Sequence, residues 1–185
     1  MEKITFGEEI LTKGVEWEKV YEKSKSKGYQ DKFIDGNEIR ANRVGKLGEL
    51  AFKKFLDSQK IKYIYDDRIL DELDEQDFIL FENGKECKID VKTQLNEYIP
   101  NEEWNCEVNE KQKNKKVDYY IFVKLSETQK RCFFVGFISY GLFWKIAKRK
   151  NAGEEMYGGE KVKGAKWDVK IKELSKPEEF IKSFS

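Results

Sequence analysis

Histidine is absent from all 185 residues of the chain. Its absence excludes Ser-His-Asp and Cys-His catalysis, histidine-bound zinc, and any acid–base mechanism that uses an imidazole. Catalysis by this chain would therefore have to use carboxylates, lysine, tyrosine, cysteine or a metal ion held by oxygen ligands.

Cysteine and long apolar runs are also scarce. The three cysteines, Cys87, Cys106 and Cys132, lie far apart and lack the close pairing of a zinc site. We expect free thiols in a reducing cytoplasm. The first residues have no apolar segment of the signal-peptide kind, and no stretch is apolar enough to span a membrane. The sequence therefore predicts a cytoplasmic protein with no membrane partner.

The composition suits a packed globular domain. Hydrophobic residues make up 39% of the chain and aromatic residues 14%, and the length suits one domain, residues 1–185. The net charge is +1, so no overall field attracts nucleic acid. Any binding of a polyanion would depend on a local basic surface.

Hydrophobic periodicity and turn signals predict an α/β fold with a central mixed β-sheet. The predicted helices are 14–27, 41–58, 140–150 and 177–184, and the polar segment 108–117 also suits a helix. The predicted strands are 62–65, 77–82, 86–93, 119–125, 131–138 and 167–171. We expect a core at about 41–138, an N-terminal helical extension at 1–40, and a C-terminal helix-loop-strand extension at 139–185.

A β-hairpin is indicated by Asn83-Gly84, which lies between two apolar runs. A two-residue turn pairs Glu82 with Lys85, and the same register brings Asp77 opposite Asp90. Facing carboxylates destabilise a hairpin, more so where screening is weak. A divalent cation would compensate, and Mg²⁺ prefers one or two carboxylates with water and phosphate oxygens. A bulge would shift this pairing by one residue.

The return strand of the hairpin alternates apolar and charged residues. Its apolar side chains are expected to face a covering helix: Cys87, Ile89 and Val91. Asp90 and Lys92 share the other face, roughly 6.6 Å apart along the strand. A solvated charged face is the alternative, but apolar Ile79 and Phe81 share the face of Asp77 on the partner strand.

The helix at 41–58 carries a third carboxylate, Glu49, at the edge of its apolar stripe. Gly45 and Gly48 lie within one turn of Glu49, and a glycine inside a helix costs roughly 1 kcal/mol. Two such residues suggest close backbone approach to the sheet or to a phosphate. The alternative for Glu49 is an exposed helical glutamate without a special role.

Together these residues resemble the PD-(D/E)XK nuclease superfamily, which includes many restriction endonucleases and archaeal Holliday-junction resolvases. The resemblance lies in Glu49 on a helix, Asp77 at the start of a hairpin, and Asp90-Val91-Lys92 on the return strand. It spans roughly residues 41–125, in the order helix–strand–strand–strand–helix–strand. Gln76 stands where many relatives have proline. The resemblance implies a restriction-endonuclease-like three-layer α/β/α core.

The resemblance also implies a function, metal-dependent hydrolysis of DNA phosphodiester bonds by an endonuclease. Asp77, Asp90 and the Val91 carbonyl would hold Mg²⁺ or Mn²⁺, with Glu49 bound directly or through water. Lys92 would orient or deprotonate the attacking water, and Gln94 would lie near the scissile phosphate. The alternative is a catalytically inactive module that binds nucleic acid or a protein on a nuclease-like fold.

Two further expectations concern partners. The densest basic run is a candidate for contacts with DNA phosphates, the alternative being a solvated surface; it comprises Lys111, Lys113, Lys115 and Lys116. A homodimer would match the two-fold symmetry of duplex DNA. Its surface would come from aromatic residues that alternatively fill the core: Phe133, Phe134, Phe137, Tyr140, Phe143 and Trp144.

Overall fold

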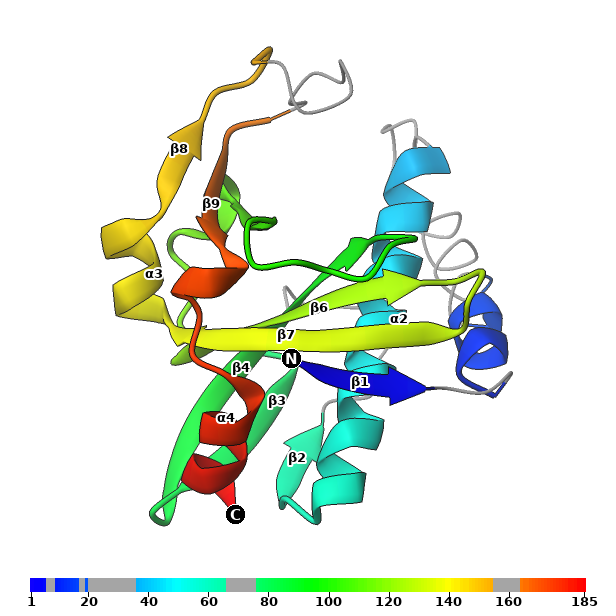
Figure 1. Ribbon diagram of the computed structural model, residues 1–185, viewed down its shortest axis with the longest axis vertical. Helices are drawn as coiled ribbons and strands as arrows, with labels where there is room; N and C mark the ends of the chain where they lie inside the picture. The colour runs from blue at the N-terminus through cyan, green and yellow to red at the C-terminus, as the bar shows by residue number, and fades with distance from the viewer. Residues whose placement is uncertain (6–8, 17–18, 20–35, 66–75, 155–163) are drawn as a thin grey trace, which may run out of the picture.

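The computed structural model describes residues 1–5, 9–16, 19, 36–65, 76–154 and 164–185 (Figure 1). Residues 9–16 are helical. The other helices are α2 (Gly36–Gln59), α3 (Tyr140–Ile146) and α4 (Pro177–Phe184), with one-turn 3-10 helices η1 (Glu110–Gln112) and η2 (Ile171–Glu173). The strands are β1 (Glu2–Thr5), β2 (Tyr63–Tyr65), β3 (Phe78–Glu82), β4 (Lys85–Leu95), β5 (Asn105–Asn109), β6 (Tyr119–Ser126), β7 (Arg131–Ser139), β8 (Lys148–Lys150) and β9 (Lys166–Lys170).

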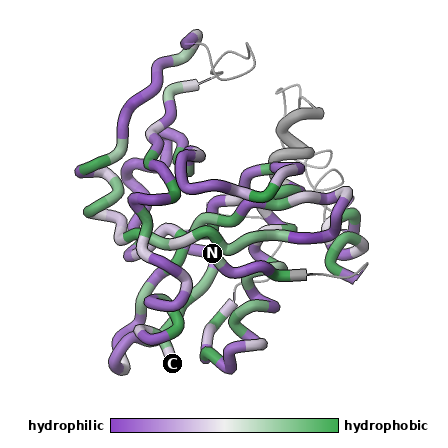
Figure 2. Tube along the Cα trace, viewed as in Figure 1, coloured by the Kyte–Doolittle hydropathy of each residue, from purple (hydrophilic) through white to green (hydrophobic). Residues whose placement is uncertain are grey.

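The central sheet has six strands in the order β1-β7-β6-β4-β3-β2. β4 and β6 are parallel, whereas β2 with β3, β3 with β4, β6 with β7, and β1 with β7 are antiparallel. The predicted α/β class with a central mixed sheet is therefore confirmed. The near-continuous apolar runs of β6 and β7 place these strands in the middle, where both faces are covered (Figure 2).

The two faces of this sheet are covered differently (Figure 1). α2 and α4 pack on one face through aromatic residues that include Phe52, Phe55 and Phe180. α3 covers the other face together with a three-stranded sheet in the order β5-β9-β8. Where the predicted α/β/α arrangement has its second layer of helices, the structure thus has a small sheet and one short helix.

Gly48 explains how closely α2 approaches the sheet. A Cβ at this position would lie 1.8 Å from Oγ1 of Thr93 on β4. No heavy atom lies within 4 Å of the position that a Cβ of Gly45 would take. The expectation of close backbone approach to the sheet is therefore confirmed for Gly48, and Gly45 does not share it.

Local signals predicted some elements well and others wrongly. α2 contains the predicted helix 41–58, and α4 has the predicted bounds. Most of the segment 108–117 is not helical. Its beginning belongs to β5, in which Cys106 and Val108 are buried, and only the one-turn helix η1 follows. The predicted helix 140–150 ends at Ile146, because Ala147 has an extended backbone and β8 begins at Lys148. β1 was not predicted, and most of the predicted helix 14–27 lies outside the described residues.

The aromatic residues considered for a dimer surface belong to the chain's own cores. Phe133, Phe134, Phe137 and Phe143 are buried, and the half-buried Tyr140 and Trp144 pack against the core beside β6. The alternative that these residues fill the core is confirmed for the four phenylalanines, whereas Tyr140 and Trp144 are only partly buried.

The expectation of free thiols is met in the described residues. Cys87, Cys106 and Cys132 are buried free thiols. No helix in the described ranges combines the length and the apolar character needed to cross a membrane.

Candidate active site

The hairpin of β3 and β4 has the register that its turn predicts. Five residue pairs run from Glu82 with Lys85 to Phe78 with Ile89. The ladder stops there, because Asp77 lies at a bend just before β3. Its amide donates to the Ile89 carbonyl at 2.8 Å, and its Oδ2 accepts from the Val91 amide at 2.6 Å. Asp77 thus bonds to the β4 backbone and does not form the expected cross-strand pair with Asp90.

β4 runs beyond its partner at this point. Residues 90–95 of β4 remain paired with β6, whereas the pairing with β3 ends at Ile89. The amide and carbonyl of one strand residue point to the same side. Because the Val91 amide points to Asp77, the Val91 carbonyl lies along the same edge of β4. A carboxylate and a carbonyl therefore line the edge that β3 leaves uncovered.

Glu49 reaches this region from α2. Its Oε2 accepts hydrogen bonds from Lys46 Nζ and from the Tyr65 hydroxyl, each at 3.2 Å. Lys46 Nζ also lies 4.8 Å from the centroid of the Tyr65 ring. Burial raises the pKa of Glu49, and the charge of Asp90 adds to this rise, while Lys46 and Tyr65 offset part of it. Glu49 is therefore a partly buried, hydrogen-bonded carboxyl rather than an exposed surface glutamate.

Asp90 is the most buried of the three carboxylates in accessible surface, with 1% of the residue exposed. Lys92 Nζ lies 2.6 Å from its Oδ2 and Lys115 Nζ lies 3.1 Å from its Oδ1. Burial alone would raise the pKa of Asp90, but Lys92 and Lys115 together outweigh burial and lower it. Asp90 is thus held in its ionised form.

Asp77 has the opposite electrostatic environment. Burial raises its pKa well above the ordinary value, and the charges of Glu49 and Asp90 raise it further, against the weaker effect of Lys115 and Lys92. Two carboxylates that repel a third are a setting in which a bound cation stabilises the group. The pKa shifts of Glu49 and Asp77 show that the three acidic groups act on one another.

Gln94 follows Asp90 and Lys92 on the same face of β4. Its side-chain oxygen accepts a hydrogen bond from Lys124 Nζ on β6, and Lys124 also donates to the Asn105 carbonyl at 2.6 Å. Burial lowers the pKa of Lys124. Because the oxygen of Gln94 is bound to Lys124, its NH₂ group is the part left to donate to another partner.

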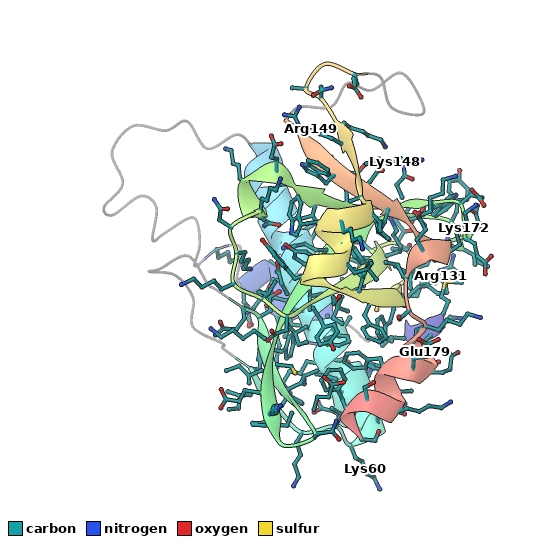
Figure 3. All side chains as sticks on the ribbon, turned by 90° about the vertical axis from the view of Figure 1, so that its left-hand side faces the viewer. Lys60, Arg131, Lys148, Arg149, Lys172 and Glu179 are labelled. Atoms are coloured by element: carbon teal, nitrogen blue, oxygen red, sulfur yellow. The ribbon has the colours of Figure 1, made fainter. Side chains whose placement is uncertain are left out.

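The basic run considered for DNA contacts divides in two. Lys111, Lys113 and Lys116 are exposed, and Lys113 Nζ lies 5.0 Å from the ring centroid of Trp167. Lys115 instead turns inward to Asp90. A second group of basic residues, Lys148, Arg149 and Lys150, forms β8 at the end of the molecule opposite Lys60 (Figure 3). Nε of Arg149 lies 2.8 Å from Oε1 of Glu110.

Sequence reasoning missed three residues of this site. Lys46 stands three residues before Glu49, a helical spacing that places the two side chains together and could have found it. The inward position of Lys115 depends on the path of the segment before β6. Tyr65 comes from a neighbouring strand, β2, and no local signal pointed to it.

The side chains of Asp77 and Asp90 and the Val91 carbonyl offer oxygen donors at this edge of β4. In the described part of the chain, no group of three or more His, Cys, Asp or Glu side chains is arranged to hold a metal ion. The available donors are nevertheless all oxygen atoms, the kind that Mg²⁺ and Mn²⁺ take. Oδ2 of Asp90 is buried and, among the described residues, has the ion pair with Lys92 but no partner with hydrogen-bond geometry.

Comparison of the chain with protein-family models, curated proteins and solved structures gave no match. A function for this site must therefore be inferred from its residues and their geometry.

Proposed function

We propose that the protein is a metal-dependent endonuclease that hydrolyses DNA phosphodiester bonds. One observation carries this proposal. Three carboxyl groups, Glu49, Asp77 and Asp90, interact electrostatically where β4 extends beyond β3, and Lys92 contacts one of them. Without histidine, an oxygen-bound metal ion together with a lysine is a sufficient set for phosphodiester hydrolysis.

Each residue has a separate task in this mechanism. Asp77, Asp90 and the Val91 carbonyl would hold Mg²⁺ or Mn²⁺, with Glu49 binding directly or through water. The bound ion supplies a Lewis acid for the phosphate and an acidified water. The Lys92 ammonium would orient that water and offset negative charge on the phosphate. The NH₂ group of Gln94 would donate to a phosphate oxygen.

The order of the elements supports the likeness to the PD-(D/E)XK superfamily. α2 comes first, β2, β3 and β4 form an antiparallel series, and β6 joins parallel to β4. The superfamily order has a helix between the last two strands, where this chain has β5 and η1. The choice of DNA over RNA depends on the resemblance alone.

An inactive binding module on the same fold is the second candidate. The ion pairs that Asp90 makes with both Lys92 and Lys115 favour it, because both oxygens have a cation without any metal. Titration with Mg²⁺ or Mn²⁺, followed by thermal unfolding, separates the two. If the metal site is formed, the unfolding temperature of the protein rises with metal concentration, whereas a module without the site shows no such rise.

The direct experiment is incubation with supercoiled, linear, branched and single-stranded DNA in Mg²⁺ and in Mn²⁺. Asp90→Ala and Lys92→Ala should each abolish cleavage in a folded protein. Matched controls are Glu86→Ala and Lys85→Ala, which change exposed residues of the same strand and should cut normally. Cleavage by Asp90→Ala or Lys92→Ala, or by the unchanged protein in excess EDTA, would refute the assignment.

A homodimer remains a proposal that depends on the two-fold symmetry of duplex DNA. Light scattering with and without DNA tests it, and a dimer mass is the expected result. A monomer mass in both conditions would refute the dimer and favour an enzyme that nicks duplexes or cuts single strands.

A further inference from the structure

Lys115 differs from its neighbours in the basic run. Lys111, Lys113 and Lys116 are exposed, whereas Lys115 is partly buried and its Nζ lies 3.1 Å from Asp90 Oδ1. Lys92 lies at the other oxygen, Oδ2, at 2.6 Å. The carboxylate of Asp90 is thus contacted on both oxygens by ammonium groups from two different parts of the chain.

The segment that delivers Lys115 is anchored on both sides. The Lys115 amide donates to the Gln112 carbonyl at 3.0 Å, and the Asp118 amide donates to the Lys88 carbonyl at 2.8 Å. Asp118 Oδ2 also accepts from the Lys88 amide at 2.7 Å. These bonds fix the backbone beside β4, so the approach of Lys115 to Asp90 follows from the fold.

The two lysines are not equivalent in freedom. Lys92 stands two residues from Asp90 on a strand that is paired with β6, so its backbone is held beside Asp90. Lys115 comes from a loop between exposed Asn114 and Lys116, and its side chain can turn outward without moving a strand. A cation that binds Asp90 repels both ammonium groups, and Lys115 is the one with room to leave.

We propose that Lys115 is the counter-ion of Asp90 in the metal-free protein and competes with the divalent cation for this carboxylate. The inference rests on the proposed metal site. Once displaced, the Lys115 ammonium lies beside the carboxylate edge and is available to a phosphate group of the substrate. Lys115 is therefore a positioning residue that keeps the acidic cluster neutralised until the metal binds.

Removal of the Lys115 charge should strengthen metal binding. Methionine keeps most of the side-chain length and lacks the charge. At an effective dielectric constant of about 20, a unit charge a few ångströms away changes the binding of a cation by roughly tenfold or more. Lys116→Met is the matched control, because it makes the same change at the next, exposed residue.

The test is calorimetric titration of Mn²⁺ into the full chain, with Lys115→Met and Lys116→Met titrated in parallel. We expect Lys115→Met to lower the Kd roughly tenfold or more and Lys116→Met to leave it within about twofold. Equal or weaker binding by Lys115→Met would overturn the inference alone. Failure of all three proteins to bind Mn²⁺ would overturn the metal site and the inference with it.

A thermodynamic cycle without metal tests the same pairing and does not depend on cleavage. The four proteins are the unchanged chain, Lys115→Met, Asp90→Asn, and the double variant. If Lys115 acts as counter-ion, its replacement lowers the unfolding temperature when Asp90 is present and has little effect after Asp90→Asn. An equal loss in both backgrounds would mean that the side chain only packs, and it would overturn the counter-ion role.

Discussion

Gly48 is the residue whose replacement tests most directly how α2 places Glu49. In Gly48→Ala, the new Cβ would lie 1.8 Å from Thr93 Oγ1 and 2.7 Å from both Cβ and Cγ2 of Thr93. Rotation of the Thr93 side chain moves Oγ1 and Cγ2 but leaves its Cβ in place. The helix must therefore move away from β4, and it would carry Glu49, the next residue, with it.

The expected size of the effect follows from two opposing terms. Overpacking of this kind costs typically 1–3 kcal/mol, and contacts as short as these place Gly48→Ala near the upper end, at about 3 kcal/mol. Alanine is better than glycine in a helix by about 1 kcal/mol. The net loss in the free energy of unfolding is therefore about 2 kcal/mol. Gly45→Ala meets no atom within 4 Å, so it should gain about 1 kcal/mol.

Thermal unfolding followed by circular dichroism measures the difference. For a chain of this size, 1 kcal/mol corresponds to about 2–4 °C, so the two variants should differ by roughly 6–12 °C. Thr93→Gly should rescue part of the loss in a double variant, because it removes the three atoms nearest to the new Cβ. Similar unfolding temperatures for Gly48→Ala and Gly45→Ala would refute the close approach of α2 to β4.

Two further results are expected. Because burial beside Glu49 and Asp90 raises the pKa of Asp77, its carboxylate opposes folding above that raised pKa, and the penalty vanishes below the ordinary value of 3.8, where both states are protonated. Asp77→Asn should thus raise the unfolding temperature of the metal-free protein near neutral pH, and this gain should shrink as the pH falls. A lower unfolding temperature of Asp77→Asn near neutral pH would contradict this. Burial raises the pKa of Cys106 and of Cys132 to about 12, so iodoacetamide should modify both at mildly alkaline pH only after unfolding, as mass spectrometry would show, and rapid labelling of the folded chain would contradict their burial.

The features that sequence predicted well are determined by neighbouring residues. Asn83 and Gly84 both have positive φ angles, 51° and 76°, which suit a two-residue hairpin turn and fix the register of β3 and β4. The apolar period of α2 likewise identifies its buried face. Pro177 stands in the first turn of α4 and marks its beginning.

The features that sequence did not predict depend on distant partners. β1 joins the sheet through β7, more than a hundred residues along the chain. β5 and β8 both pair with β9, which lies far from β5 along the chain. Their strand structure depends on this pairing, and neither segment has a strong local strand signal. The small sheet that covers the second face could not be read from period alone, because its strands are short and partly polar.

The candidate site shows the same division. Asp90 and Lys92 share a face because strand side chains alternate, and that relation could be read from the sequence. The bend at Asp77 could not, since it depends on a hydrogen bond from Val91 across the edge of β4. Lys115 was assigned to the surface with its three neighbours, and its position beside Asp90 follows from contacts of Asp118 with Lys88 that no spacing reveals.

The energetics of the site give it little value for stability, which agrees with the proposed function. Replacing a buried ion pair with apolar residues of similar volume is often neutral or stabilising, so a fold has little to gain from burying Asp90 between Lys92 and Lys115. Asp77, whose pKa is raised by the same surroundings, adds a further penalty. Two such penalties lie together where α2, β3 and β4 meet, whereas the other buried carboxylate of the described residues, Asp168, pairs with Lys150 in the small sheet. Local conflict of this kind in an otherwise consistent fold is expected at functional sites, and it is the physical reason to test for activity where β4 extends beyond β3.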